Sequence, residues 1–277
     1  MSNINRLRYA KNTIEGLNRN ERFTFANRYS LHVFPSNAIY TFIPKNGCST
    51  LRYSLAIANG YLDPESDPNW IHSNIHGMSP LFKVNEYTLS TAAYSFVILR
   101  CPFRRLASAF FDKVIDMKIP IQRLCKTIDP AINSKDRMIS SIEKMTFSNF
   151  VENICSLPRE KLDEHFRPQI DFLTLENYSR WFCLENFSEI ESRLKSDIRF
   201  VLHDTRNKIG HDSHGYSMIS ADFSNVNIAT LRKLKNTKKL PVASDLYNST
   251  ARKLVTKYFA EDIKLYSQLF GASNMLF

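Results

Sequence analysis

The sequence predicts an α/β fold with three layers, α/β/α, around a central and mainly parallel sheet. Two stretches, 38–60 and 94–110, each read as a buried strand followed by a tight turn and a helix. The apolar run at 94–99 is typical of a parallel strand that is covered on both faces. A further run at 181–187 reads as another strand, and a helix is predicted after it at 188–195.

The first of these stretches has the features of an anion-binding turn. Pro44 ends the apolar run, and Gly47 can adopt a φ that other residues resist. Ser49 and Thr50 place hydroxyl groups at the start of the following helix. The N–H groups and the positive dipole end of that helix, with the Lys45 ammonium beside them, predict a cradle for a phosphate or sulfate group.

The order of residues in this turn differs from that of a Walker loop. A Walker loop has glycine, four residues and then Gly-Lys-Ser/Thr, whereas here Lys45 precedes Gly47. No carboxylate with the role of a Mg²⁺ ligand is visible beside it. An ATP-dependent, P-loop-like phosphotransferase is therefore kept as an alternative, and so is an ordinary surface turn with a solvated lysine.

The second stretch would bring two phosphate-binding groups to the end of a strand. Arg100 follows the strand directly, at the carboxyl end where open α/β sheets bind ligands. Pro102 suits the first turn of a helix, and Ser108 lies further along that helix. The guanidinium of Arg100 can make a bidentate contact to one phosphate group, and the hydroxyl of Ser108 would add a further bond.

Both stretches resemble the cofactor-binding motifs of carbohydrate sulfotransferases, which use 3′-phosphoadenosine 5′-phosphosulfate (PAPS). The segment IPKNGCST at 43–50 resembles their 5′-phosphosulfate loop. The segment RCPFRRLASAF at 100–110 resembles their 3′-phosphate motif, usually Arg-Asp-Pro-x-x-Arg-Leu-x-Ser-x-Phe, although Cys101 replaces the acidic residue that would brace the turn. The resemblance is to Golgi-type and uronyl 2-O-sulfotransferases, and it implies a P-loop-like fold and a PAPS-dependent sulfotransferase.

The resemblance also implies which residues bind PAPS and its product, 3′-phosphoadenosine 5′-phosphate (PAP). Lys45 would stabilise the leaving phosphate and the transferring sulfonate, while the amides of 46–50 would hold the 5′-phosphate. Arg100 and Ser108 would grip the 3′-phosphate, which distinguishes PAPS from ATP, and no metal is expected. The cofactor-binding residues implied in this way are Pro44, Lys45, Asn46, Gly47, Cys48, Ser49, Thr50, Arg100 and Ser108.

Histidines are the candidates for the base that deprotonates the acceptor, a glycan or a small hydroxylated molecule. In uronyl 2-O-sulfotransferases the base lies between the two cofactor motifs, and His76 lies in that interval, with His72 as runner-up. Both could instead be packed residues, and a metal site would need a third ligand. His165 is the third candidate, because 165–169 resembles a His-x-x-Pro-Gln element of the family that implies acceptor binding by His165 and Arg167.

The charge of the chain favours an anionic partner. Its 277 residues include 37 Lys and Arg against 27 Asp and Glu, a net charge of +10. Nucleic acid is not the predicted partner, because the basic residues are dispersed and no RNA-binding aromatic signature accompanies them. A glycan, an anionic cofactor or a membrane surface would explain the charge equally well, so a non-enzymatic polyanion-binding protein is the second alternative.

The composition predicts one domain over 1–277, with 1–37 as an extension that packs on a catalytic core at 38–277. Five cysteines, an odd number without zinc-site spacing, favour a reducing cytoplasm. No signal peptide and no transmembrane segment is expected, which favours a soluble bacterial-type member over a Golgi one.

The remaining elements are predicted from local patterns. A helix is expected at 4–18, and a short strand or a covering edge at 23–34. Loops and short helices are expected at 118–148, where polar residues are mixed along the chain. Apolar residues at helical spacing predict one long terminal helix at 246–269.

Overall fold

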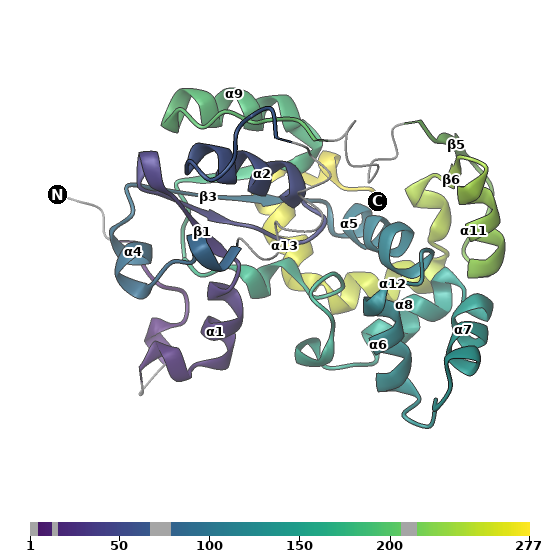
Figure 1. The fold of residues 1–277 in the computed structure, drawn as a ribbon. Helices are drawn as coiled ribbons and strands as arrows, with labels where there is room; N and C mark the ends of the chain where they lie inside the picture. The colour runs from purple at the N-terminus through teal and green to yellow at the C-terminus, as the bar shows by residue number, and fades with distance from the viewer. Residues whose placement is uncertain (1–4, 13–15, 67–78, 206–214) are drawn as a thin grey trace. The chain divides into compact units, whose positions relative to one another are not determined.

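The structure is a computed structural model that describes residues 5–12, 16–66, 79–205 and 215–277 (Figure 1). The chain forms two compact units. The first unit is Met1–Arg100 with Gln169–Gly210, and the second unit is Cys101–Pro168 with His211–Phe277. The assignment of 1–277 to a single domain stays a prediction.

The first unit contains a four-stranded, mainly parallel sheet, which confirms the predicted fold class. In sheet order the strands are β1 (Ser30–Val33), β2 (Ala38–Thr41), β3 (Tyr94–Leu99) and β4 (Arg180–Cys183). Strand β1 is antiparallel to β2, whereas β2, β3 and β4 are parallel, with Thr41 opposite Val97 and Leu99 opposite Cys183. The carboxyl ends of the three parallel strands therefore lie at one end of the sheet.

Helices cover the sheet of the first unit and exclude water from its central strands. Helices α2 (Cys48–Ala58) and α9 (Phe187–Ile198) lie along one face, and α1 (Glu21–Asn27) lies toward the other (Figure 1). In the covered sheet Tyr40 of β2 stacks on Phe96 of β3, with ring centroids 5.0 Å apart. Burial of each such side chain contributes about 1.5–3 kcal/mol, so the two central strands anchor the turns that follow them.

The amino-terminal region differs from the helix expected over 4–18. Its described residues form short 3-10 turns, and the first α-helix begins later, at Glu21. The reason is the Asn20 side chain, which accepts a hydrogen bond from the N–H of Phe23 at 3.0 Å and caps α1. Of the strand or edge predicted at 23–34, only β1 is extended, and it forms the antiparallel edge of the sheet.

The other elements of the first unit are short. They are α4 (Glu86–Thr91) and the 3-10 segments Ala10–Asn12, Leu17–Arg19, Phe34–Ser36, Ser79–Phe82, Gln169–Phe172 and Leu184–Asn186. The last two segments matter for function, because Gln169–Phe172 and Leu184–Asn186 contribute side chains beside the turns that end β2 and β3.

The second unit is mainly helical. Its helices are α5 (Pro102–Ala109), a π-helical turn (Phe110–Val114), α6 (Ile119–Ile128), α7 (Lys135–Lys144), α8 (Phe147–Cys155), α11 (Ile228–Asn236), α12 (Ser249–Tyr258) and α13 (Ala260–Phe270). Short 3-10 segments lie at Arg159–Lys161, Ala243–Leu246 and Ala272–Asn274, and β5 (Ser217–Ile219) pairs in parallel with β6 (Lys239–Pro241). Among the described residues, no helix has the length and apolar character to cross a membrane.

The long terminal helix expected over 246–269 is two helices, α12 and α13, which meet at Phe259. This residue leaves the helical conformation, with φ −99° and ψ 27°, and its side chain is buried. The change of direction allows Val255 of α12 and Tyr266 of α13 to be completely buried. Burial of these side chains in both helices outweighs the loss of one continuous helix.

A cluster of phenylalanines forms the core of the second unit. The ring centroids of Phe110 and Phe147 lie 5.0 Å apart, and those of Phe150 and Phe166 lie 5.1 Å apart. All four side chains are completely buried. Because Phe166 belongs to the predicted acceptor-binding element, this packing fixes the backbone of that element.

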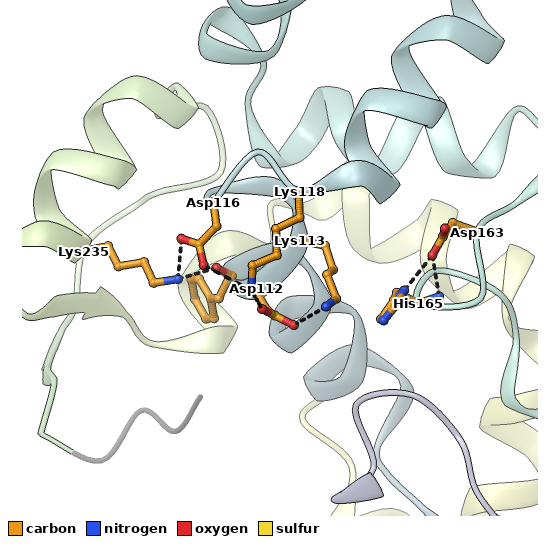
Figure 2. A network of polar contacts seen from close by, with 8 residues as sticks. Asp112, Lys113, Asp116, Lys118, Asp163, His165 and Lys235 are labelled. Carbon is orange, nitrogen blue, oxygen red and sulfur yellow. Dashed lines mark hydrogen bonds and ion pairs between the residues drawn. The ribbon is translucent and has the colours of Figure 1, made fainter. Parts of the chain in front are cut away.

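Ion pairs hold the turn after α5 against α11 (Figure 2). The carboxylate of Asp112 pairs with Lys113 at 3.0 Å and with Lys118, and Asp116 accepts from Lys235 at 2.7 Å. Lys235 also donates to the carbonyl oxygen of Phe111 at 2.9 Å. The groups satisfy one another inside the second unit, so we assign this network a structural role.

Candidate functional site

The turn between β2 and α2 has the backbone geometry of an anion-binding loop. Lys45 and Gly47 have positive φ values of 73° and 74°, and backbone of this kind can form a concave nest of N–H groups. Among the described residues no side chain caps α2, so the N–H groups of its first turn can bind an anion. The positive φ favours glycine at position 47, and a Cβ atom there would also lie 3.1 Å from Cδ1 of Leu184, a tight contact.

The side chains of this loop divide between the interior and the surface. Pro44, Asn46 and Thr50 are buried, whereas Lys45, Gly47, Cys48 and Ser49 are half-buried. The hydroxyl of Thr50 lies 3.0 Å from the hydroxyl of Thr205, so it braces the start of α2. Among the polar residues of the loop, Lys45 and Ser49 are thus half-buried, whereas Asn46 and Thr50 are buried.

Arg100 contacts the same loop from the end of the neighbouring strand. Its Nη1 donates to the carbonyl oxygen of Lys45 at 3.1 Å, and its Nε lies 4.0 Å from Oε1 of Glu185. The side chain of Arg100 is about a quarter exposed, with 26% of its surface accessible. The structure therefore brings together Lys45 and Arg100, the two residues on which the sequence analysis depended most.

Gln169 joins the two turns, and the sequence analysis had not assigned it a role. Its Oε1 accepts from Nδ2 of Asn46 at 2.6 Å and from the N–H of Arg100 at 3.0 Å. Its Nε2 donates to the carbonyl oxygen of Arg100 at 2.9 Å. Gln169 is 2% exposed. The only sequence signal was its place at the end of the His-x-x-Pro-Gln element.

Helix α5 carries Ser108 in the second unit, together with an arginine that the sequence analysis did not single out. Arg104 and Ser108 are four residues apart, so they lie on one face of α5, and both are half-buried. The Nε of Arg104 is buried and, among the described residues, has no hydrogen-bond partner. This face of α5 therefore presents a cation and a hydroxyl. A helical-wheel comparison of positions 104 and 108 would have found the pair.

A second arginine of α5 holds the predicted acceptor-binding element. Arg105 is 2% exposed, and it donates to the carbonyl oxygens of Arg167 at 2.8 Å and Glu164 at 3.2 Å. Cys101, which replaces the acidic residue of the motif, is buried, and its Sγ accepts from the N–H of Leu276 at 3.3 Å. The bracing of this turn thus comes in part from the carboxyl-terminal segment.

His165 and Asp163 form a hydrogen-bonded pair in that element (Figure 2). The carboxylate accepts from Nδ1 of His165 at 2.7 Å and from its N–H at 3.1 Å, and Arg123 lies 3.5 Å away. Burial raises the pKa of Asp163, but the bonds from His165 and the charge of Arg123 outweigh it and hold that pKa below its usual value. A carboxylate on Nδ1 leaves Nε2 able to accept a proton, as in a general base.

A cavity of about 450 Å³ opens beside this pair in the second unit. Asp163 lines it together with the cations Arg123, Lys126 and Lys161. The volume suits a small ligand or one or two sugar rings, and the lining favours negative charge. Arg167 is 7% exposed, so its guanidinium is mostly covered, and its role in acceptor binding stays a prediction.

The two histidines predicted as the base, His76 and His72, lie outside the described residues. Within the described part of the chain, no group of three or more His, Cys, Asp or Glu side chains could hold a metal ion. Among the described residues, the first unit contributes the loop amides, Lys45 and Arg100, and the second unit contributes the His165–Asp163 pair.

In the comparison with known proteins, a family model described as "Sulfotransferase family" matches residues 33–267. No curated protein and no solved structure matches. The matched region begins in β1 and ends in α13, and it includes the β2–α2 turn, Arg100, α5 and the His165–Asp163 pair.

Proposed function

Because this chain belongs to the sulfotransferase family, we propose that it transfers a sulfonate group from PAPS to a hydroxyl group of a carbohydrate or another small hydroxylated acceptor. The observation that carries the proposal is the contact between the two predicted cofactor motifs. Arg100, at the end of β3, donates to the carbonyl oxygen of Lys45 in the loop after β2. The guanidinium of Arg100, the backbone of Lys45 and the start of α2 thus lie at the carboxyl ends of parallel strands, where α/β sheets bind ligands.

The residues present fit the two anionic ends of PAPS, which would supply the sulfonate when bound. The amides at the start of α2 would hold the 5′-phosphate, and Lys45 would stabilise negative charge on the leaving phosphate. Arg100 and Ser108 would bind the 3′-phosphate, and Arg104 is an additional candidate because its Nε lacks a partner among the described residues. A positioned base would take the proton of the acceptor hydroxyl.

The acceptor is proposed to be a carbohydrate with negative charge. The support is the cavity beside Asp163, whose lining includes Arg123, Lys126 and Lys161. The net charge of +10 would attract such an acceptor over longer distances. An ATP-dependent phosphotransferase is less well supported, because the order of Lys45 and Gly47 is not that of a Walker loop.

Nucleotide-dependent melting tests the proposal. We expect PAP to raise the melting temperature, since a ligand at about 100 times its Kd adds about 2.7 kcal/mol of stability. ATP with Mg²⁺ should raise it much less, and EDTA should change neither the PAP effect nor turnover with PAPS. Stabilisation by ATP and Mg²⁺ alone would favour the phosphotransferase, and stabilisation by heparin without any nucleotide would favour a polyanion-binding protein.

Arg100→Ala should separate recognition of the 3′-phosphate from recognition of the rest of the nucleotide. A hydrogen bond to a charged group contributes about 1.5–3 kcal/mol, so we expect PAP to bind roughly 10- to 150-fold more weakly. Adenosine 5′-phosphosulfate, which lacks the 3′-phosphate, should lose much less, as measured by calorimetric titration. Equal losses for the two nucleotides would show that Arg100 only supports the Lys45 loop.

A further inference from the structure

We propose that Gln169 is a positioning residue that sets the spacing between the Lys45 loop and Arg100, and thereby the preference for nucleotides with both a 5′ and a 3′ phosphate group. This inference rests on the proposed function. Gln169 touches no predicted ligand group itself. It acts through Asn46 and Arg100, one in each cofactor motif.

The hydrogen bonds of Gln169 allow only one orientation of its amide. Its Oε1 lies between two donors, Nδ2 of Asn46 at 2.6 Å and the N–H of Arg100 at 3.0 Å. Its Nε2 faces an acceptor, the carbonyl oxygen of Arg100, at 2.9 Å. A reversed amide would place NH₂ against both donors and an oxygen against the carbonyl. The site therefore needs a donor and an acceptor at the tip of one side chain of this length.

The same bonds fix the two motifs against each other inside the first unit. Nδ2 of Asn46 also donates to the carbonyl oxygen of Ile98 at 2.8 Å, so both of its N–H groups bind at the end of β3 or beside it. Gln169 binds both the N–H and the C=O of Arg100. These two bonds restrict the backbone conformation of Arg100 and therefore the direction in which its guanidinium projects. Asn46 and Gln169 are 0% and 2% exposed, so water does not compete for these bonds.

A fixed spacing affects ligands with two anionic groups more than ligands with one. PAP must meet the amides of the loop and the guanidinium of Arg100 at the same time, so its affinity depends on their separation. Adenosine 5′-monophosphate (AMP) would engage the loop alone, and its affinity would depend little on where Arg100 lies. A general loss of stability would instead weaken the two nucleotides alike.

Gln169→Glu is the sharpest test, because it keeps size and shape and replaces only Nε2 by an oxygen that faces the carbonyl oxygen of Arg100. We expect the Kd for PAP to rise at least tenfold and the Kd for AMP to rise less than threefold, as measured by calorimetric titration. Gln169→Asn, in which the amide is withdrawn by one methylene group, should show the same selective loss if the glutamate variant folds poorly.

Asn59→Asp provides the matched control. The Asn59 amide also bridges a backbone N–H and C=O, with Oδ1 accepting from Phe34 and Nδ2 donating to His32, both at 2.8 Å, but at the opposite end of α2. Its exchange should lower the melting temperature and leave the ratio of PAP to AMP affinity unchanged.

A double-mutant cycle with Arg100→Ala completes the experiment. If Gln169 acts through Arg100, Gln169→Glu should no longer alter the PAP to AMP ratio once Arg100 is alanine. Equal losses for PAP and AMP, no loss, or additive losses in the cycle would overturn the proposal. Absence of PAP binding to the unmodified protein would instead overturn the proposed function, so the two failures are distinguishable.

Discussion

Replacing Lys45 with alanine is expected to lower kcat for sulfonate transfer by about 100- to 1,000-fold. This is the fall in kcat that usually follows when an enzyme loses one preorganised hydrogen-bond donor to the negative charge of the transition state. Lys45 is placed for this role by its positive φ, by its position ahead of the uncapped start of α2 and by the bond from Arg100 to its carbonyl oxygen. The measurement is initial rate with PAPS and a fixed acceptor.

Two comparisons make the Lys45 result specific. Lys45→Arg keeps the charge and should recover part of the rate, whereas Lys195→Ala removes an exposed lysine from the last turn of α9 and should change nothing. The affinity for PAP should fall less than kcat, because charge on the leaving phosphate is greatest during transfer. An unchanged rate in Lys45→Ala would show that the loop is a structural turn without a catalytic role.

Loss of the catalytic histidine is expected to have the largest effect, a fall in kcat of about 100- to 10,000-fold with PAP affinity nearly unchanged. We expect this for His76→Ala and a smaller loss for His72→Ala. In the unmodified protein kcat/KM should rise through an apparent pKa of about 6.5, and this rise should disappear in the variant that lacks the base.

His165 is the residue to compare with these two, because the structure gives it a carboxylate partner. If His165→Ala removes the rise with pH while His76→Ala does not, the base is His165 and the sulfotransferase proposal stands. Asp163→Asn should then shift the profile as well, because Asp163 holds Nδ1. His32→Ala is the control, since its Nε2 is bonded to a neutral amide, that of Asn37, at 3.0 Å.

Local patterns predicted the strand–turn–helix units because their causes are local. Pro44 and Gly47 mark the turn between β2 and α2, and Pro102 begins α5 after the turn that follows β3. The meeting of Lys45 and Arg100 also follows from sequence, since parallel strands end at the same end of a sheet. The proximity of Lys45 and Arg100 could therefore be predicted without knowing any contact between distant residues.

The features that the sequence did not predict depend on contacts between residues far apart in the chain, or on packing that overrides the local pattern. Gln169 binds Asn46 across 123 positions, and nothing in the sequence near either residue indicates the pairing. No glycine or proline at Phe259 indicates that the helix is interrupted there. The interruption is explained by the burial of side chains from both α12 and α13. At the amino terminus, the cap at Asn20 determines where the helix begins.

The chain leaves the first unit at Arg100 and re-enters it at Gln169, and these two residues are hydrogen-bonded to each other. The two ends of segment 101–168 are therefore tied together in the first unit, although the segment itself folds with 211–277 as the second unit. The entropy of closing a loop grows slowly, by about 0.6 kcal/mol for each doubling of its length. Insertions or deletions at surface positions of 101–168 that spare α5 and the phenylalanine core should therefore cost the first unit little stability. If the acceptor binds in the cavity lined by Arg123, Lys126 and Lys161, its specificity can change in this way while Arg104 and Ser108 of α5 stay unaltered.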